Sequence, residues 1–402
     1  MSKMPKLRFE KFSEEWHKKK LGELLEFKNG INASKEQYGK GIKFINVLDV
    51  LNNDYITYDN IIGKIDIDEQ TLKKNIVEYG DVLFQRSSET REEVGTANVY
   101  LDKEKKATFG GFIIRGKKIG DYNPAFINKL LKTKMARKEI ISRAGGSTRY
   151  NVGQEILKDV ELLFPSDEEQ QKIAQFFYLI DKKIEKQQEK VEVLKDYKKG
   201  MMQKIFSQEM RFKDGNGEDY REWRNYKIKD CFLERSERGF SNFELISVSM
   251  EKGVCKRSEI EGKDNSSEDK SNYKLVKEND IVYNSMRMWQ GASGVSKYIG
   301  IVSPAYTVLK PKKNVYSDYF GYKFKTPDMI NEFRKYSQGL TSDTWSLKYP
   351  QIKNIKISLP SLEEQKKIAT FLLKFDQKLE KEQSKLIMLN TWKKGLLQQM
   401  FI

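Results

Sequence analysis

Residues 165–206 read PSDEEQQKIAQFFYLIDKKIEKQQEKVEVLKDYKKGMMQKIF, and residues 360–401 read PSLEEQKKIATFLLKFDQKLEKEQSKLIMLNTWKKGLLQQMF. The two stretches align without a gap at an offset of 195 residues, from the opening proline to the closing phenylalanine. A repeat of this length indicates a duplicated architecture, because each copy should adopt the same structural unit. The chain is therefore expected to consist of two similar halves, each ending in one copy.

Each copy has the pattern of a long helix. Apolar residues recur in steps of three and four, the spacing of one helical face in a coiled coil. About 40 helical residues span about 60 Å, more than the width of a domain of roughly 150 residues, whose radius of gyration is near 15 Å. Part of each helix is therefore expected to contact another helix instead of its own domain. The predicted seam consists of Ile173, Phe177, Ile180, Ile184, Val191, Leu194, Ile368, Leu372, Phe375, Leu379, Leu386 and Leu389.

The two long helices are expected to pair with each other. Because both belong to one chain, their effective concentration favours an intramolecular pair. The offset of 195 residues between equivalent positions permits a parallel or an antiparallel arrangement. We expect the antiparallel one, since it relates the two halves by a pseudo-twofold axis.

The segments outside the two copies are predicted to be globular. Each copy is preceded by a short apolar run, 157–164 or 352–359, that is typical of a β-strand and stops at the proline. Helix-like patterns cover 126–143 and 319–336. The fold class is therefore α+β, with two globular mixed α/β domains joined by two long helices that form an intramolecular antiparallel coiled coil. The predicted divisions are a first domain with an N-terminal arm at 1–164, a central helix at 165–206, a second domain at 207–359 and a distal helix at 360–402.

The charge of the chain indicates a nucleic-acid partner. Its 402 residues include 74 Lys and Arg against 58 Asp and Glu, a formal net charge of +16. The two helical copies have net charges of only +1 and +3, so a charge of +12 belongs to the rest of the chain. Such a basic surface favours nucleic acid over an anionic membrane, which would require a basic amphipathic helix with an exposed apolar face.

Two loops in each half have side chains suited to bases and phosphates. Arginine forks suit guanine edges, amides suit adenine, and hydroxyl groups bind phosphates. The candidate DNA-binding residues of the first half are Arg86 and Arg91, then Arg143, Arg149 and Tyr150. Those of the second half are Asn284, Arg287, Trp289 and Gln290, then Thr344, Trp345 and Lys348. Each side chain is alternatively solvated or packed on its own domain, so the prediction concerns the loops as units.

The sequence contains no recognisable catalytic or cofactor motif. It has neither a G-x-x-x-x-G-K-[ST] phosphate loop nor a G-x-G-x-x-G turn. The single histidine, His17, and the two cysteines, Cys231 and Cys255, cannot complete an ordinary zinc site, so no metal is expected. The first residues lack the apolar core of a signal peptide, and no stretch approaches the roughly 20 apolar residues of a membrane span. We therefore predict a soluble, cytoplasmic, non-catalytic protein without a cofactor of its own and without a membrane partner.

The repeated motif resembles a known family. A duplicated P-S-x-E-E-Q-x-K-I-A-x-F, followed by a long helix that ends in K-K-G-x-x-Q-x-x-F, is similar to the conserved regions of the specificity (S) subunit of type I restriction-modification systems. The resemblance covers the full length. It implies two target-recognition domains that each read one half of an asymmetric two-part sequence in double-stranded DNA, and helices that set the gap between the halves. The domains match the family only in outline, so no base contact is transferred.

The same resemblance implies partners and cofactors outside this chain. Two modification subunits, which bind S-adenosylmethionine and methylate adenine at N6, would dock on the helical repeats. Restriction subunits that use ATP and Mg would complete the nuclease. The docking residues by resemblance are Glu168, Glu169, Gln170, Glu363, Glu364 and Gln365, although an acidic first turn also stabilises a helix by itself.

Two other functions fit parts of the sequence. A coiled-coil scaffold that binds only proteins would explain the helices and leave the basic charge without a role. A self-contained methyltransferase or nuclease would show activity with this chain and cofactor alone. Salt separates DNA binding from the scaffold, because binding through several phosphates weakens steeply as salt rises and apolar docking does not.

Overall fold

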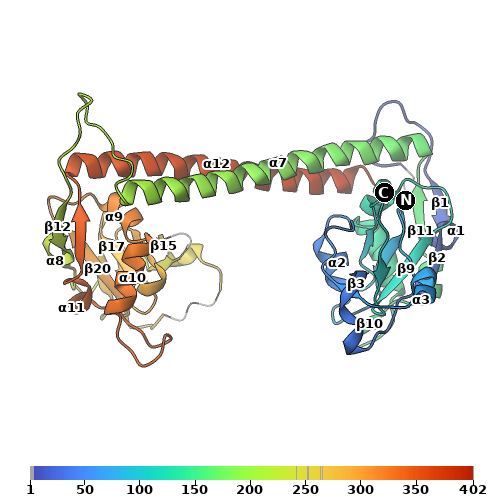
Figure 1. Ribbon diagram of the computed structural model, residues 1–402, viewed down its shortest axis with the longest axis horizontal. Coiled ribbons are helices and arrows are strands. Elements are labelled where there is room, and N and C mark those ends of the chain that lie inside the picture. The colour runs from blue at the N-terminus through green and yellow to red at the C-terminus, as the bar shows by residue number, and fades with distance from the viewer. Residues whose placement is uncertain (1–3, 241, 251–252, 263, 265, 402) are drawn as a thin grey trace. The chain divides into compact units, whose positions relative to one another are not determined.

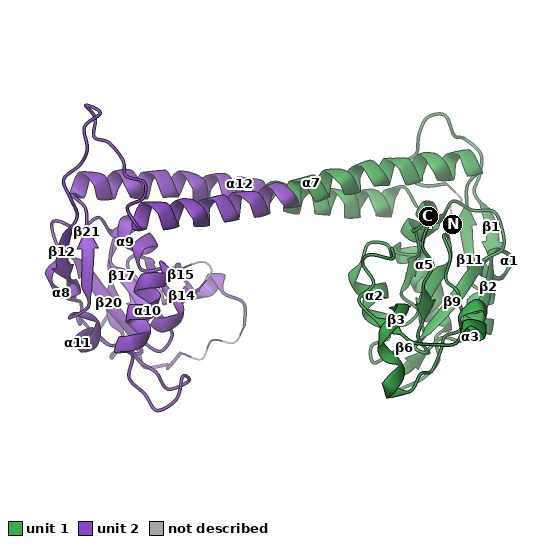
Figure 2. Cartoon of the chain, in the orientation of Figure 1, with its two compact units in different colours: residues 1–188, 384–402 green, residues 189–383 purple. Residues whose placement is uncertain are grey.

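The computed structural model describes residues 4–240, 242–250, 253–262, 264 and 266–401. The chain forms two compact units, unit 1 with residues 1–188 and 384–402 and unit 2 with residues 189–383 (Figure 2). Each unit combines short helices and small sheets with a segment of each of two long helices (Figure 1). In the part of the chain that is described, no helix is both long and apolar enough to cross a membrane.

Unit 1 has a four-stranded antiparallel sheet with the strand order β2-β9-β5-β7. A separate pair, β1 with β11, leads into the first long helix. The elements of its globular part are β1 (His17–Lys20), α1 (Leu21–Leu24), β2 (Leu25–Asn29), β3 (Tyr38–Ile45), α2 (Val47–Asn52), β4 (Lys64–Ile65), α3 (Glu69–Lys74), β5 (Val82–Gln85), β6 (Ser87–Ser88), β7 (Ala97–Val99), β8 (Thr108–Phe109), β9 (Ile113–Lys118), α4 (Pro124–Leu130), α5 (Lys134–Arg143), β10 (Tyr150–Asn151), α6 (Gln154–Lys158) and β11 (Glu161–Phe164).

Unit 2 repeats this topology. Its four-stranded sheet has the order β13-β20-β17-β18, and β12 pairs with β21 before the second long helix. The elements of its globular part are β12 (Arg224–Lys227), α8 (Ile228–Cys231), β13 (Phe232–Glu234), β14 (Ile246–Ser249), β15 (Gly253–Lys256), β16 (Lys274–Val276), β17 (Ile281–Asn284), β18 (Ser293–Val295), β19 (Gly300–Val302), β20 (Tyr306–Pro311), α9 (Ser317–Lys323), α10 (Pro327–Tyr336), α11 (Tyr349–Ile352) and β21 (Lys356–Leu359). The duplication predicted from the helical repeat therefore extends to the globular parts.

The helix-like patterns at 126–143 and 319–336 do not form single helices. Each is divided into two, α4 and α5 in unit 1 and α9 and α10 in unit 2. In unit 1 the Thr133 hydroxyl accepts the Ala136 N–H at 3.3 Å and so caps a new helix. In unit 2 the new helix opens on Pro327, which has no N–H to donate to the preceding turn.

The two long helices are α7 (Asp167–Phe206) and α12 (Leu362–Gln399). Each begins two residues after a proline, with a serine hydroxyl accepting a backbone N–H of the first turn. Ser166 accepts from Glu169 at 3.4 Å, and Ser361 accepts from Glu364 at 3.2 Å. Acidic side chains in both first turns are also favoured by the positive end of the helix dipole.

Segments of α7 and α12 pair antiparallel within each unit. In unit 1 the Asp181 carboxylate accepts from Lys393 at 2.8 Å, and the rings of Phe177 and Phe401 have centroids 6.0 Å apart. In unit 2 Lys190 donates to Glu382 at 2.6 Å, and Lys198 forms an ion pair with Asp376 further along. Residue numbers rise on one helix as they fall on the other, which confirms the antiparallel prediction.

The predicted seam is buried or half-buried along its whole length. Ile173, Phe177 and Ile180 belong to the core of unit 1, and Ile368 and Leu372 belong to the core of unit 2. The ends of the seam therefore contact a domain as well as a helix. Val191 is buried, and the half-buried seam residues are Ile184, Leu194, Phe375, Leu379, Leu386 and Leu389.

The core of unit 1 is assembled from segments far apart in the sequence. The Phe401 ring contacts Trp16, Phe126 and Phe177, with centroid distances of 6.2, 5.4 and 6.0 Å. All four side chains are at most 6% exposed. Leu396, Met400 and Phe401, at the end of the chain, are therefore part of the same core as the first domain.

Candidate nucleic-acid interface

In unit 1 the two predicted loops lie side by side. Strands β6 and β10 pair antiparallel with Ser87 opposite Asn151, and the Ser87 hydroxyl donates to Asn151 Oδ1 at 2.6 Å. The Val152 N–H donates to the Arg86 carbonyl at 3.0 Å. The loop after β5 and the loop after α5 therefore form one continuous surface.

Unit 2 joins its two loops in the same way. The Leu347 N–H donates to the Ser285 carbonyl at 2.8 Å, at the position equivalent to the backbone bond of unit 1. The Trp289 and Trp345 rings, one from each loop, meet edge to face with centroids 5.3 Å apart. The sequence predicts each loop separately, and the structure shows that they act as a pair in both units.

The second loop of each pair closes in a tight turn at a glycine. Gly146 has a φ of +113°, and a Cβ at this position would lie 2.1 Å from the Arg149 carbonyl oxygen. At the equivalent Gly339 a Cβ would lie 2.6 Å from the Thr344 carbonyl oxygen. Only glycine fits this approach of backbone to backbone. The turns thereby fix the direction in which Arg149 and Thr344 project.

The predicted DNA-binding side chains differ in how free they are to reach a ligand. Arg143 already forms an ion pair with Glu139 at 2.6 Å, and Asn284 Oδ1 accepts the Met286 N–H at 3.0 Å. The exposed residues are Arg86, Arg91, Arg143, Arg149, Arg287, Gln290, Thr344 and Lys348, and the half-buried ones are Tyr150, Asn284, Trp289 and Trp345. Contacts from these residues to bases or phosphates stay a prediction.

Arg137 is a site residue that the sequence did not reveal. It lies on α5, and its Nη2 donates to the carbonyls of Glu92 at 2.9 Å and Val94 at 2.7 Å. Burial lowers the pKa of Arg137 to about 10, so the side chain is still a cation at neutral pH. It holds the segment that carries Arg91, but nothing in the local sequence distinguishes it from a surface arginine.

A cavity of about 640 Å³ opens between the paired loops of unit 1. It is lined by Asn29, Arg86, Gly145, Gly146, Asn151, Val152, Gly153, Gln154, Glu155 and Ile156. Backbone groups, an arginine, three side-chain amides and the Glu155 carboxylate line it, together with glycine and aliphatic residues. This combination can accept the edge of a base or a phosphate.

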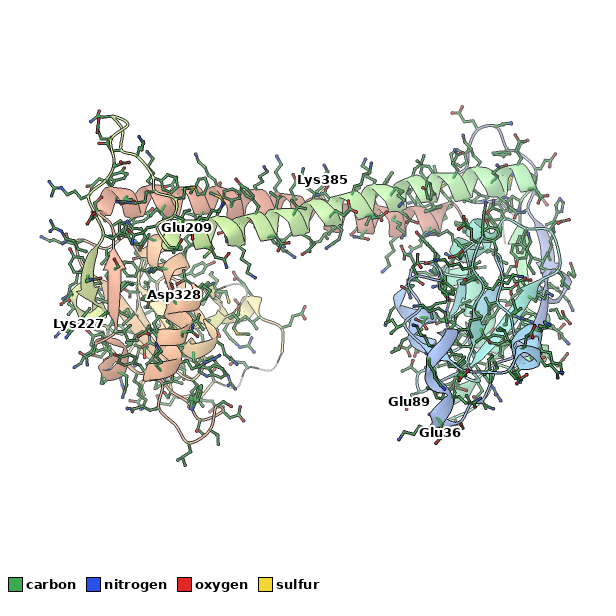
Figure 3. The ribbon with its side chains drawn as sticks, in the orientation of Figure 1. Glu36, Glu89, Glu209, Lys227, Asp328 and Lys385 are labelled. Carbon is green, nitrogen blue, oxygen red and sulfur yellow. The ribbon has the colours of Figure 1, made fainter. Side chains whose placement is uncertain are left out.

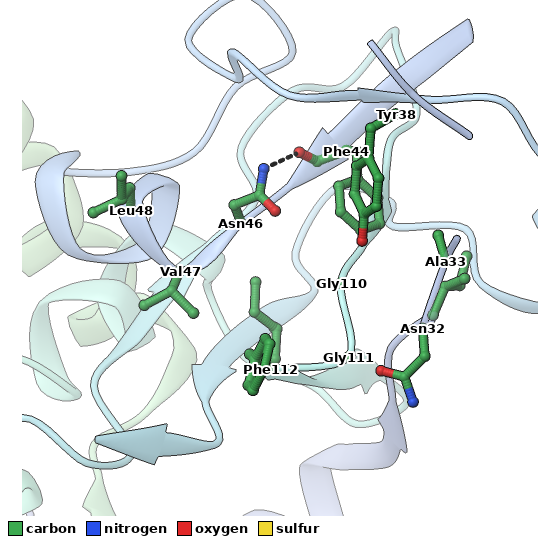
Figure 4. A pocket seen from close by; sticks show the side chains of 12 residues that line it. Asn32, Ala33, Tyr38, Phe44, Asn46, Val47, Leu48, Gly110, Gly111 and Phe112 are labelled. Atoms are coloured by element: carbon green, nitrogen blue, oxygen red, sulfur yellow. Dashed lines mark hydrogen bonds between the residues drawn. The ribbon is translucent and has the colours of Figure 1, made fainter. Parts of the chain in front are cut away.

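A second, more apolar cavity of about 410 Å³ lies in the same unit (Figure 4). The rings of Tyr38 and Phe44 lie together on one side with centroids 5.6 Å apart, and Phe112 lies apart from them. Phe112 is 64% exposed, and its carbonyl accepts the Arg86 N–H at 2.9 Å. This bond joins the apolar cavity to the paired loops. The two glycines before Phe112 are the only sequence signal for it.

Among the described residues, no group of three or more His, Cys, Asp or Glu side chains is placed to hold a metal ion. Cys231 and Cys255 are 3% and 4% exposed. Burial raises the pKa of the Cys231 thiol to about 12, so it stays protonated at neutral pH and packs as a small apolar side chain.

Family membership follows from the repeated domain. The family model for the type I restriction modification DNA specificity domain matches residues 13–195 and again residues 220–389. This chain belongs to that family. Each match contains one pair of loops and the start of one long helix, so the specificity subunit carries its DNA specificity domain twice.

Curated relatives and solved structures agree with this assignment. The chain is 25% identical to a Methanocaldococcus jannaschii protein named as the MjaX type I restriction enzyme specificity subunit, over 383 residues, 91% of this chain and 88% of the relative. It is 30% identical to the MjaIX specificity subunit of that organism over 193 residues, 46% of this chain and 42% of the relative.

Three solved structures share the fold of the specificity subunit. The S subunit from M. genitalium aligns with a TM-score of 0.55 and 16% identity over 99% of both chains. The HsdS subunit from Thermoanaerobacter tengcongensis aligns with a TM-score of 0.50 and 16% identity over 96% of both chains. A chain from a study of complex assembly and conformational transition of the type I R-M system aligns with a TM-score of 0.58 and 13% identity. The alignment covers 96% of this chain and 97% of that chain.

The predicted docking residues of the specificity subunit fall into two groups. Glu168 and Glu363 are exposed. The other four, Glu169, Gln170, Glu364 and Gln365, are at most 2% exposed and bond within their own unit. These four therefore cannot form the surface that was expected of them, because the fold has covered the inner side of each first turn. Docking of other subunits stays a prediction for Glu168 and Glu363.

The buried residues of the E-E-Q motif hold the domain to the long helix. In unit 1 Arg8 binds Glu169 through two bonds of 2.8 and 2.7 Å, which ties the N-terminal arm to α7. Gln170 Oε1 accepts the Asn123 N–H at 3.0 Å, just before α4. Gln170 Nε2 also donates to the Pro165 carbonyl at 3.1 Å. The motif is therefore an internal joint between three segments.

Proposed function

We propose that this specificity subunit reads an asymmetric two-part DNA sequence, one part with the paired loops of each unit. The proposal depends on one observation, the equivalent arrangement of loops that carry different side chains. Arg149 and Tyr150 of unit 1 occupy the positions of Thr344 and Trp345 in unit 2. Readers with the same scaffold and different contact residues are expected to prefer different bases.

The exposed side chains supply suitable chemistry on each surface. In unit 1, Arg86 and Arg149 can each offer two N–H groups to a guanine edge or a phosphate. In unit 2, Arg287 offers the same fork, Gln290 suits adenine, and Lys348 suits a phosphate.

We further propose that the chain is a non-catalytic scaffold for enzymes that act elsewhere in the complex. Two modification subunits with S-adenosylmethionine would methylate adenine, and restriction subunits with ATP and Mg would cleave DNA in the cytoplasm. The absence of a recognisable catalytic motif from the sequence supports this division of labour. A solved chain of similar fold comes from a study of type I complex assembly, which also supports it.

Sequencing of methylated adenines in cells with and without this chain tests the proposed function. We expect a two-part motif to disappear when the chain is removed and to return when it is supplied again. The double variant Arg86→Ala and Arg149→Ala should relax one half of the motif and leave the other half unchanged. Methylation that does not depend on the chain would refute the proposal.

A scaffold that binds only proteins is the second candidate, favoured by the long antiparallel helices. Binding of the purified complex to its DNA target at about 50 and about 200 mM salt separates the two functions. A DNA reader with roughly six to ten phosphate contacts should lose roughly 10³ to 10⁵ in affinity over this range. A scaffold should show no specific DNA binding at either concentration.

A further inference from the structure

The junction between the globular domain and the long helix has the same hydrogen bond in both units, so each residue of one junction has an equivalent in the other. Gln170 accepts the Asn123 N–H in unit 1, and Gln365 accepts the Tyr316 N–H in unit 2, both at 3.0 Å. These bonds align α4 and α5 with α9 and α10 at an offset of 193 residues. The long helices align at an offset of 195 residues.

In unit 1 this junction is closed by Asp54, from the loop after α2. The Asp54 carboxylate accepts from Lys393 of α12 at 2.8 Å. Its backbone carbonyl accepts from Asn128 Nδ2 at 2.8 Å and from Lys132 Nζ. A carboxylate and a carbonyl of the chain itself therefore satisfy two lysines and an amide at this position.

In unit 2 no loop carboxylate among the described residues is bonded at the equivalent position. Lys198, Gly321 and Lys325 replace the three residues that hold Asp54, and Gly321 contributes no side chain. A groove of about 1000 Å³ is lined by all three of these residues. The groove is lined by Lys195, Lys198, Lys199, Gly200, Met202, Gln203, Lys204, Phe206, Ser207, Glu209, Gly321, Tyr322, Lys325, Thr326, Pro327, Asp328 and Asp376.

The groove has an excess of positive charge, with five lysines against three acidic residues. Lys198 pairs with Asp376, and Lys195 pairs with Glu192 outside the groove at 2.9 Å. The other three lysines, 199, 204 and 325, form no ion pair with the residues that the structure describes, although the charge of Asp376 acts on Lys325 from a distance. Desolvation and the nearby Lys198 ammonium lower the pKa of Lys325. A negative group would relieve this accumulation of charge.

The groove does not belong to the DNA-reading surface of unit 2. Two acidic residues of its lining show where it lies (Figure 3). Asp328 is in the first turn of α10, and Glu209 comes three residues after Phe206, the last residue of α7. The reading loop with Thr344 and Trp345 follows the other end of α10, which is 10 residues or about 15 Å long. The position beside a long helix therefore favours a protein ligand over the DNA that is read by the loops.

We propose that this groove binds an acidic segment of a modification subunit, whose carboxylate takes the place that Asp54 fills in unit 1. This inference rests on the proposed function, in which modification subunits dock on the helical repeats. Its consequence is that the two halves dock their partners unequally. Unit 2 offers an open cationic groove, and unit 1 has its own carboxylate in the equivalent position.

The test measures binding of the purified modification subunit to the full-length chain. Lys204→Glu combined with Lys325→Glu reverses two groove charges, and both residues are exposed in the folded chain. We expect the titration to become biphasic, with one of the two modification subunits bound roughly tenfold more weakly. Native mass spectrometry should then show the one-to-one complex accumulating at concentrations where the unchanged chain forms the two-to-one complex.

The matched control is Lys277→Glu combined with Lys313→Glu. Both residues are exposed in unit 2 and do not line the groove, and the double variant changes the net charge of the chain by the same amount. The control should bind like the unchanged chain, and all variants should melt at the same temperature. Equal affinities of groove variant and control would overturn the inference, as would a groove variant that loses only DNA binding. If the unchanged chain failed to bind the modification subunit, the proposed function itself would be wrong.

Discussion

Arg8 and Arg211 each neutralise a glutamate that the fold has buried at the start of a long helix. The side chains of Glu169 and Glu364 are both 1% exposed, and the arginines approach them to 2.7 and 3.0 Å. The hydrogen bond and the charge of Glu169 raise the pKa of Arg8 although desolvation opposes this, so the guanidinium stays charged at neutral pH. The arginine is therefore required wherever the glutamate is buried.

Replacing Arg8 with methionine is expected to destabilise unit 1 by about 3–5 kcal/mol, because Glu169 would remain as an uncompensated buried charge. Adding Glu169→Gln should recover much of this loss. Urea denaturation followed by tryptophan fluorescence measures both variants. Lys11→Met is the control, since the side chains of Lys11 and Glu168 are 69% and 65% exposed and their ion pair should contribute at most about 1 kcal/mol. Equal losses for the two single variants would contradict this role of Arg8.

Phe112 is expected to act in DNA recognition by unit 1. Phe112→Ala should weaken binding of the preferred DNA by roughly tenfold, because the apolar contact area beside Arg86 would be lost. Methylated-adenine sequencing should show the change in one half of the motif only. Ile62→Ala removes another side chain that is 89% exposed in the same unit and should leave binding and motif unchanged.

The sequence predicted the surface position of the candidate DNA-binding residues better than that of the docking residues. Residue types suited to DNA can be recognised without a structure, which is why Arg86 and Arg149 were found on surface loops. Their pairing through β6 and β10 could not be predicted, because strands of two residues leave almost no periodicity. Burial of Glu169 and Gln170 depends on segments far away in the sequence, such as the arm that carries Arg8, and no local pattern reports those contacts.

At the scale of elements, the tight turn after α5 should control the geometry of recognition. Gly146→Ala places a Cβ against the Arg149 carbonyl and requires a φ that alanine disfavours, at a cost of about 1–3 kcal/mol in local strain. We expect the turn to open and DNA binding by unit 1 to weaken without loss of the fold. Gly215→Ala is a control outside the paired loops, since no atom lies within 4 Å of the position that its Cβ would take. Identical DNA affinities of the two variants would show that the turn is not a determinant.

The sequence predicted the long helices over their whole length and the short elements only in part. The strands expected in 157–164 and 352–359 are present as β11 and β21, which occupy the last four residues of each run. About forty residues with a constant apolar spacing specify a helix, and their polar interruptions recur at the same places in both copies. Segment 126–143 also has helical spacing, but its division at Thr133 depends on a hydroxyl cap and on packing against the sheet. Local periodicity does not record such tertiary contacts.

At the scale of the whole molecule, the division into units falls at equivalent points of the repeat. Unit 1 ends at Gln188 on α7 and resumes at Ser384 on α12, and the boundary residues 188 and 383 are 195 positions apart. Each long helix thus changes unit near its middle. Both helices can therefore be lengthened at the same place without disturbing either globular part.

Inserting about seven helical residues after Gln188 and the same number after Gln383 should change the gap in the DNA target and leave both half-sequences unchanged. Such an insertion adds about 10.5 Å of helix and preserves the phase of the apolar seam. At about 3.4 Å per base pair, the preferred gap should grow by roughly three base pairs. Methylated-adenine sequencing reads the gap directly. A motif with its original gap would show that the helices do not set the distance.

The dependence of unit 1 on Phe401 also has a consequence for biosynthesis. Domains made early in translation ordinarily fold first. Here the whole of unit 2, 195 residues, is translated between Gln188 and the segment that completes the aromatic cluster around Trp16. Unit 2 is continuous and can fold as it leaves the ribosome, whereas unit 1 has to wait with part of its core uncovered. The half that is synthesised first is therefore finished last, and during this interval the nascent chain is most open to chaperones and proteases.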